Sequence, residues 1–118
     1  MNGIYSFRNK DGIVIYLGQS ENVFNRALTH WDEKPVRGCV SFSCYNPIQA
    51  LELGAENFSA HQIKRILLCE EALALSRLTP RPTLNKQFPS DDSIADLFRK
   101  CPLAYQRKII SRIESPFS

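Results

Sequence analysis

The sequence lacks any apolar stretch that approaches the roughly 18 residues a membrane-spanning helix needs. Its N-terminus has no apolar segment of the kind found in signal peptides. It also contains no internal repeat, no low-complexity tract and no zinc-finger spacing of cysteines and histidines. These absences argue against a membrane, secreted or repeat protein, and we expect a cytoplasmic protein with no membrane partner.

Cysteines are few, and none belongs to a Cys-x-x-Cys pair. They stand at Cys39, Cys44, Cys69 and Cys101. In a chain expected to be cytoplasmic, such cysteines are usually reduced and buried, so we predict four free thiols, most of them buried. A zinc site on Cys39 and Cys44 is poorly spaced, and a regulatory disulfide has still less support.

Charge of either sign is modest. The chain has 118 residues, of which 43% are hydrophobic and 23% charged, enough for one compact domain without covalent staples. The net charge is +3, and the excess of Lys and Arg lies in the second half. This mild basic bias suits a partner with a phosphate backbone but does not demonstrate one.

The first 18 residues predict a β-hairpin. Residues 3–8 alternate in the manner of a strand, residues 9–12 carry the Asp-Gly turn signal, and residues 13–18 form a more apolar strand. A third strand is predicted over Cys39 to Tyr45. The chain between and after these strands has helical character, so the expected class is α+β, a small three-stranded antiparallel sheet flanked by helices.

Ser20 is a typical helix N-cap and predicts a helix to about Trp31. Its apolar side is expected to hold Val23, Ala27, Leu28 and Trp31. A second set, Asn22, Arg26 and His30, recurs every four residues and should form a polar stripe.

Further helices are predicted in the second half from capping residues and prolines. They run from Asn46-Pro47 to near Gly54, from Ser59 to about Leu78, from Ser90 over 91–100, and from Pro102 to about Ile113. The only boundary lies near residues 87–91. It separates a core domain over residues 1–87 from a C-terminal helical extension over 88–118, expected to pack on the core.

Two tripeptides carry the strongest motif, Gly-Ile-Tyr at residues 3–5 and Tyr-Leu-Gly at residues 16–18. They are followed in order by Arg26, His30, Glu71 and Asn85, with a proline at position 80. This pattern resembles the GIY-YIG nuclease superfamily over about residues 1–87, with Leu17 in place of the usual isoleucine. The resemblance implies a divalent-metal-dependent endonuclease that hydrolyses DNA phosphodiester bonds with Mg²⁺ or Mn²⁺.

The resemblance also implies a role for each polar residue. Glu71 would hold the metal through its carboxylate oxygens, and the fork of Arg26 would stabilise phosphate charge. The neighbouring Glu70 is the alternative metal ligand, since helical periodicity does not exclude it.

The remaining expected catalytic residues are Tyr5, Tyr16, His30 and Asn85. The phenols of Tyr5 and Tyr16 would lie near the attacking water, although a phenol is a poor base unless cations lower its pKa. His30 would accept or relay a proton, and Asn85 would hold phosphate or the catalytic loop by hydrogen bonds.

Two departures from the family pattern keep a second hypothesis open. Position 19 is glutamine, and the stretch from Pro80 to Asn85 is about two residues longer than usual. An inactive nucleic-acid-binding module with the same fold is therefore the alternative. A homodimer through residues 91–113, or a partner protein that supplies targeting, also stays open.

Overall fold

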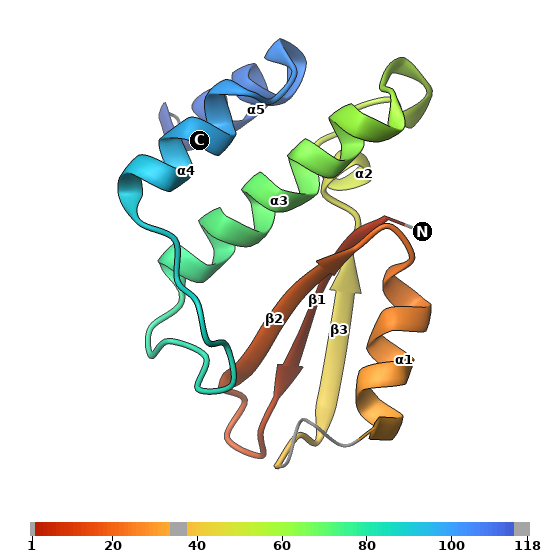
Figure 1. Cartoon of the computed structure of the whole chain (residues 1–118), viewed down its shortest axis with the longest axis vertical. Coiled ribbons are helices and arrows are strands. Elements are labelled where there is room, and N and C mark those ends of the chain that lie inside the picture. Colours follow the sequence, from red (N-terminus) through yellow and green to blue (C-terminus); the bar gives the residue numbers. More distant parts are fainter. Residues whose placement is uncertain (1, 34–37, 115–118) are drawn as a thin grey trace.

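The computed structural model describes residues 2–33 and 38–114. Three antiparallel strands form one sheet in the order β2-β1-β3 (Figure 1). Their bounds are Gly3–Arg8 for β1, Val14–Ser20 for β2 and Ser41–Tyr45 for β3. The predicted α+β class with a three-stranded antiparallel sheet is confirmed.

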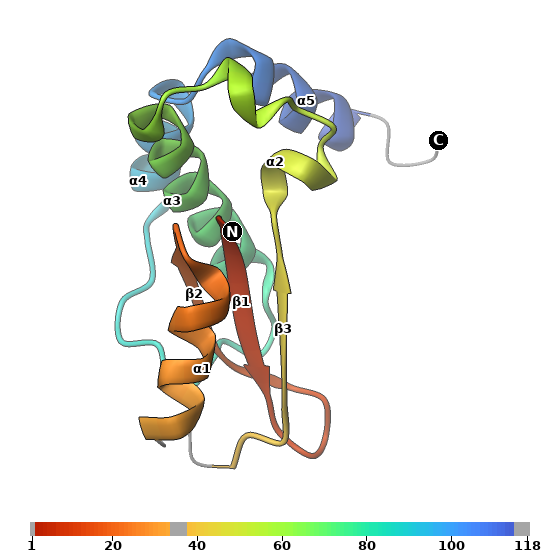
Figure 2. The ribbon, with the colours of Figure 1, turned by 90° about the vertical axis from the view of Figure 1, so that its right-hand side faces the viewer.

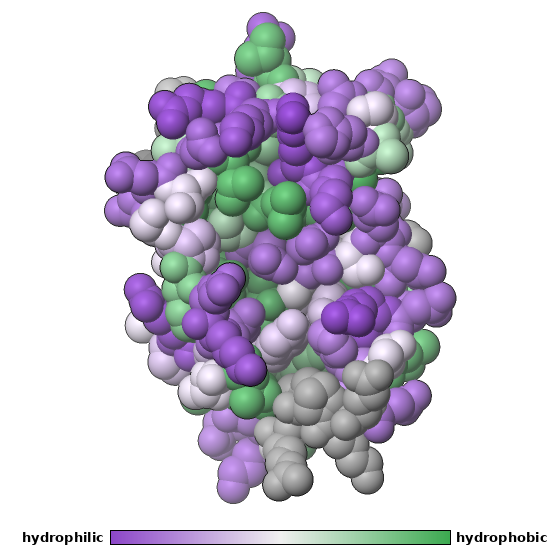
Figure 3. All heavy atoms as spheres, in the orientation of Figure 1, coloured by the Kyte–Doolittle hydropathy of each residue, from purple (hydrophilic) through white to green (hydrophobic). Residues whose placement is uncertain are grey.

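Helices lie on both sides of this sheet and continue to the end of the described chain (Figure 1). They are α1 (Val23–Glu33), α2 (Pro47–Ala50), the 3₁₀ turn η1 (Ala55–Asn57), α3 (Ala60–Arg77), α4 (Asp91–Arg99) and α5 (Leu103–Glu114). Within the described ranges, none of them is long and apolar enough to cross a bilayer. Hydrophilic residues cover most of the face seen in Figure 3.

The predicted hairpin is present, with a turn fixed by a side chain. The Asn9 Oδ1 atom accepts hydrogen bonds from the backbone N–H groups of Asp11 and Ile13, both at 3.0 Å. Gly12 has a φ of 78°, which favours glycine. Strand β2 begins one residue later than predicted and extends to Ser20.

Local capping signals gave three helix starts correctly. Asn46 caps α2, Ser59 caps α3 in a capping box with Gln62, and Ser90 caps α4. The predicted end of α2 near Gly54 is wrong, because the helix stops at Ala50. Glu52 adopts a φ of 59°, which a continuing right-handed helix cannot include.

The predicted start of α1 is wrong. Ser20 belongs to the end of β2, and its Oγ atom accepts a hydrogen bond from the backbone N–H of Asn22. The helix begins only at Val23, since the strand runs two residues further than its apolar pattern suggested.

The predicted apolar side of α1 is half right. Val23 and Ala27 are buried, whereas Leu28 and Trp31 are exposed. A single helix on an open sheet contacts it along a narrow stripe, so apolar residues beside that stripe remain in solvent.

Side chains of the hairpin face opposite sides of the sheet, with a register shift between Phe7 and Arg8 that leaves an extra residue in β2. Helices α1 and α3 lie on opposite sides of this hairpin (Figure 2). One side carries the buried cluster that α1 covers: Tyr5, Phe7, Ile15, Val23 and Ala27. The other side carries the cluster that α3 covers: Ile4, Val14, Leu17, Leu67 and Leu75. Helices α1 and α3 therefore cover opposite faces of the hairpin.

The C-terminal helices pack on α3 away from the sheet (Figure 1). Their cluster contains Ile48, Ile66, Cys69, Cys101, Tyr105 and Ile109. All four thiols are free; Cys69 and Cys101 are buried, but Cys39 and Cys44 are only half-buried. The prediction of mostly buried thiols thus holds for one pair only, because Cys39 and Cys44 lie at the sheet edge.

Candidate functional site

Two glycines of the motif are explained by close packing in the hairpin. A Cβ atom at Gly18 would lie 2.7 Å from the Cζ and Oη atoms of Tyr5, its partner across the strands. A Cβ atom at Gly3 would lie 2.5 Å from the backbone oxygen of Tyr45. The motif therefore lets the Tyr5 ring pack closely against β2 at Gly18 and lets β3 approach β1 at Gly3.

Replacing Gly18 with alanine should lower the free energy of unfolding by about 1–3 kcal/mol, because the Tyr5 ring is buried and must move. Urea denaturation measures the change. Gly54→Ala is the control, since its Cβ atom would meet only the ends of the flexible Glu56 and Asn57 side chains. Equal stability of the Gly18 and Gly54 variants would contradict this packing role.

Strand register brings the two motif tyrosines to one face, beneath α1. Tyr5 pairs with Gly18 and Phe7 with Tyr16, and the Tyr5 and Tyr16 ring centroids are 6.0 Å apart. The Tyr5 hydroxyl and His30 Nδ1 are hydrogen-bonded at 3.0 Å, and the His30 ring also lies 5.5 Å from that of Tyr16. The structure thus brings together Tyr5, Tyr16 and His30 as predicted.

The two tyrosines lie in different environments. Burial raises the pKa of Tyr5 above its usual range, Tyr16 raises it further, and the Arg26 guanidinium opposes both effects. Tyr5 is only 2% exposed. It is therefore a neutral, covered phenol, whereas Tyr16 is half-buried and reaches solvent.

An open groove of about 440 Å³ runs along the outer edge of β2. Its walls come from β2, α3 and the segment after α3: Tyr16, Leu17, Glu71, Leu75, Leu84, Asn85, Lys86 and Gln87. The Glu71 carboxylate also accepts a hydrogen bond from the backbone N–H of Gln19. Tyr16 and Glu71, which are 55 positions apart in the sequence, therefore line the same groove.

Burial raises the pKa of Glu71 above its usual value, and the Gln19 hydrogen bond only partly offsets this. The folded protein then holds the Glu71 proton more tightly than the unfolded chain does. Stability therefore falls as pH rises from the usual glutamate pKa through the raised one, and the full loss persists above that window.

In metal-free buffer, Glu71→Gln should consequently increase the free energy of unfolding at about pH 8 and have little effect at about pH 4. Urea denaturation at both pH values measures this difference. Glu56→Gln, on the exposed η1 turn, is the matched control and should change neither value. A Glu71→Gln gain that is independent of pH would argue against a buried charge.

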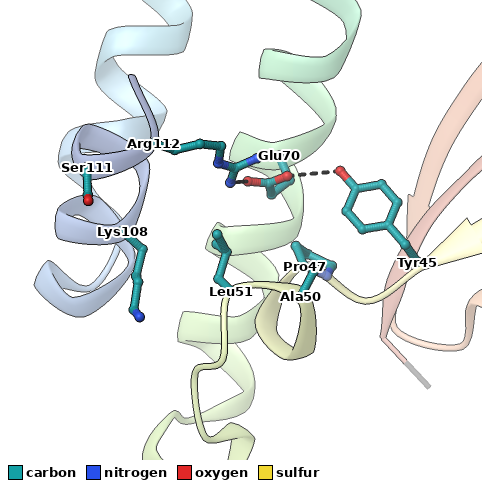
Figure 4. Close-up of a pocket in the computed structure, with 8 residues that line it drawn as sticks. All are labelled: Tyr45, Pro47, Ala50, Leu51, Glu70, Lys108, Ser111 and Arg112. Atoms are coloured by element: carbon teal, nitrogen blue, oxygen red, sulfur yellow. Dashed lines mark hydrogen bonds and ion pairs between the residues drawn. The ribbon is translucent and has the colours of Figure 1, made fainter. Parts of the chain in front are cut away.

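Glu70 occupies a different environment (Figure 4). It is 4% exposed and accepts hydrogen bonds from the Tyr45 hydroxyl at 2.9 Å and the Tyr105 hydroxyl at 2.7 Å. Arg112 pairs with it at 3.5 Å. Its oxygens are therefore engaged within the protein, on the side of α3 away from the Tyr16 groove, which favours Glu71 as the candidate ligand.

Asn85 is tied to the backbone of β2. Its Oδ1 atom accepts from the Leu17 N–H, and its Nδ2 atom donates to the Leu17 carbonyl, both at 2.9 Å. The N–H of Leu84 donates to the Ile15 carbonyl at 2.9 Å. Of the two predicted roles, this geometry supports the one in which Asn85 holds the loop.

Sequence reasoning missed two features of this region. Lys86 and Gln87 line the groove but belong to no motif position. The Tyr45–Glu70–Tyr105 network joins β3, α3 and α5, and no local pattern links residues so far apart in the chain.

No protein-family model matches the chain, and no curated protein or solved structure matches it either.

Proposed function

We propose that this protein is a metal-dependent endonuclease of the GIY-YIG type that acts on DNA in the cytoplasm. The observation that carries the proposal is the shared groove of Tyr16 and Glu71 at the edge of β2. Behind it stand the hydrogen-bonded Tyr5–His30 pair and the cationic Arg26. Tyr16 and Glu71 line this open groove, and the Arg26 guanidinium lies near Tyr5 on the α1 face of the hairpin. A phenol, a carboxylate and a guanidinium together suit phosphodiester hydrolysis.

The groove has donor chemistry that fits Mg²⁺ or Mn²⁺. Among the described residues no cluster of three or more His, Cys, Asp or Glu side chains could hold a metal, so a closed protein cage is not available there. Magnesium keeps several waters and commonly takes only one or two carboxylates together with substrate phosphates. Glu71, half-buried on the groove wall, would be the protein ligand. When bound, the metal would supply Lewis-acid polarisation of the phosphate.

The remaining side chains would position the reacting groups and stabilise the phosphate charge. Tyr16 would contact the attacking water, since Tyr16 is one of the residues that line the groove, and Arg26 would stabilise phosphate charge. Tyr5 and His30 would act as positioning residues that hold this face of the hairpin, because the Tyr5 hydroxyl is covered and bonded to His30. Asn85 would fix the groove wall.

Tyr16→Phe should therefore reduce the cleavage rate about a hundredfold or more relative to the wild type, since proton transfer by a positioned group contributes about that much. Tyr5→Phe should reduce the rate less. Initial rates on supercoiled plasmid measure the ratio. Thermal unfolding of both variants is the control for folding. A Tyr5→Phe variant slower than the Tyr16→Phe variant would reverse the assignment of the two phenols.

The experiment that tests the proposed nuclease activity is a cleavage assay on plasmid, linear, flap and four-way DNA with Mg²⁺ or Mn²⁺. Folded protein should nick or cut at least one substrate, and a chelator should stop it. DNA binding without turnover on any substrate would instead establish the alternative, an inactive nucleic-acid-binding module.

A further inference from the structure

Helix α1 exposes a stripe of large apolar residues. Phe24, Leu28 and Trp31 are 54%, 46% and 39% exposed. Their spacing places them on one flank of the helix. Arg26 and His30 lie on the other flank, facing the Tyr5–Tyr16 cluster.

The stripe continues onto β3. The Trp31 ring lies 5.5 Å from the Phe42 ring. Strand alternation places Val40 and Cys44 on the same side as Phe42, and Val40 is exposed. We call this the α1–β3 apolar surface: Phe24, Leu28, Trp31, Val40, Phe42 and Cys44. Helix α1 lies across the face of the sheet and contacts β3 as well as β1 and β2 (Figure 2).

Strand β3 is an open edge of the sheet. It pairs with β1 on one side, and no other element within residues 2–33 and 38–114 pairs with its outer side. Natural edge strands commonly carry a lysine, a proline or an inward charge that discourages pairing. Ser41–Tyr45 has none of these, and the sequence contains no charged residue from Gly38 through Leu51.

We propose that the β3 edge and the α1–β3 apolar surface bind a second copy of this chain. The two β3 strands would pair antiparallel about a two-fold axis, so that two three-stranded sheets join into one. With that axis perpendicular to the sheet, both α1 helices lie on the same face. Their apolar flanks then turn toward each other across the joint.

Three observations favour a second copy as the occupant. An edge strand is satisfied by another extended strand, and β3 supplies one. A two-fold axis requires antiparallel neighbours, and centring it on Ser43 places Phe42 opposite Cys44 on the apolar side. The uncharged stretch brings no like charges together when it meets itself. The interface also leaves the Tyr16–Glu71 groove open at the opposite edge, so the proposal does not depend on nuclease activity.

Sedimentation velocity of the purified chain over a concentration series tests the proposal. The mass should rise toward twice 13.5 kDa as concentration increases. Leu28→Asp should weaken the dimer at least about tenfold, because it places a charge in the apolar joint. Leu103→Asp is the matched control, since Leu103 is 64% exposed on α5, outside this surface. It should behave as the wild type.

Circular dichroism checks that each variant is folded, and Phe24→Asp replaces Leu28→Asp if the latter is not. Hydrogen exchange of the β3 amides gives a second readout and should slow as the dimer forms. A wild-type chain that is monomeric at every concentration overturns the proposal and leaves the edge to an extended strand of a different protein. A dimer that survives the folded α1 substitution also overturns it.

Discussion

Glu71→Ala should reduce metal-dependent DNA cleavage by at least about a thousandfold while leaving the protein folded. A metal that polarises a phosphate is worth several kcal/mol of transition-state stabilisation, and each 1.36 kcal/mol is a factor of about ten in rate. Glu71 is the glutamate that lines the groove with Tyr16. Initial rates of plasmid relaxation, with Mg²⁺ and with Mn²⁺, measure the loss.

The neighbouring glutamate is the control for this experiment. Glu70→Gln retains an oxygen acceptor for a buried phenol, so its folded fraction should cleave at close to the wild-type rate. If Glu71→Ala cleaves at the wild-type rate and Glu70→Gln is folded but inactive, the metal ligand is Glu70 and not Glu71. An inactive wild-type protein would instead remove the nuclease proposal altogether.

Glu70→Ala should cause the largest loss of stability, about 3 kcal/mol. It leaves the Tyr105 hydroxyl buried with no acceptor, removes the acceptor of the Tyr45 hydroxyl, and unpairs Arg112. Urea denaturation by fluorescence and by circular dichroism gives the free energy of unfolding.

The comparison with Glu71→Ala makes this prediction specific. Substitution of Glu70 by alanine should then lower the free energy of unfolding, whereas substitution of the adjacent Glu71 should lower the cleavage rate. Tyr105→Phe removes one hydrogen bond to Glu70 without opening a cavity, so it should cost less than Glu70→Ala. A Glu70→Ala protein as stable as the wild type would show that the network contributes nothing.

Local signals in the sequence predicted the parts of the fold that depend on neighbouring residues. The Asn9 turn and the caps at Asn46, Ser59 and Ser90 are set by hydrogen bonds within a few positions. Ser20 misled the prediction because a serine hydroxyl caps a turn as readily as a helix, and here it accepts from Asn22 at the end of β2.

The arrangement of the site could be predicted only in part from the sequence. The resemblance to the GIY-YIG superfamily implied one site for Tyr5, Tyr16 and His30, and these three side chains lie together. The choice between Glu70 and Glu71 depended on which side of α3 faces the hairpin. Helix α3 has apolar residues around most of its circumference, because it packs on the sheet on one side and on α4 and α5 on the other. Periodicity alone therefore could not decide.

The bonds that Asn85 and Leu84 make to β2 have a consequence for assembly. They occupy backbone groups on the outer edge of that strand, so, within residues 2–33 and 38–114, the sheet is blocked at β2 and open at β3. A sheet that can add a strand at one side only forms a closed pair and then stops. The Asn85 contact would thus guard against fibril growth, and its loss would expose a second edge.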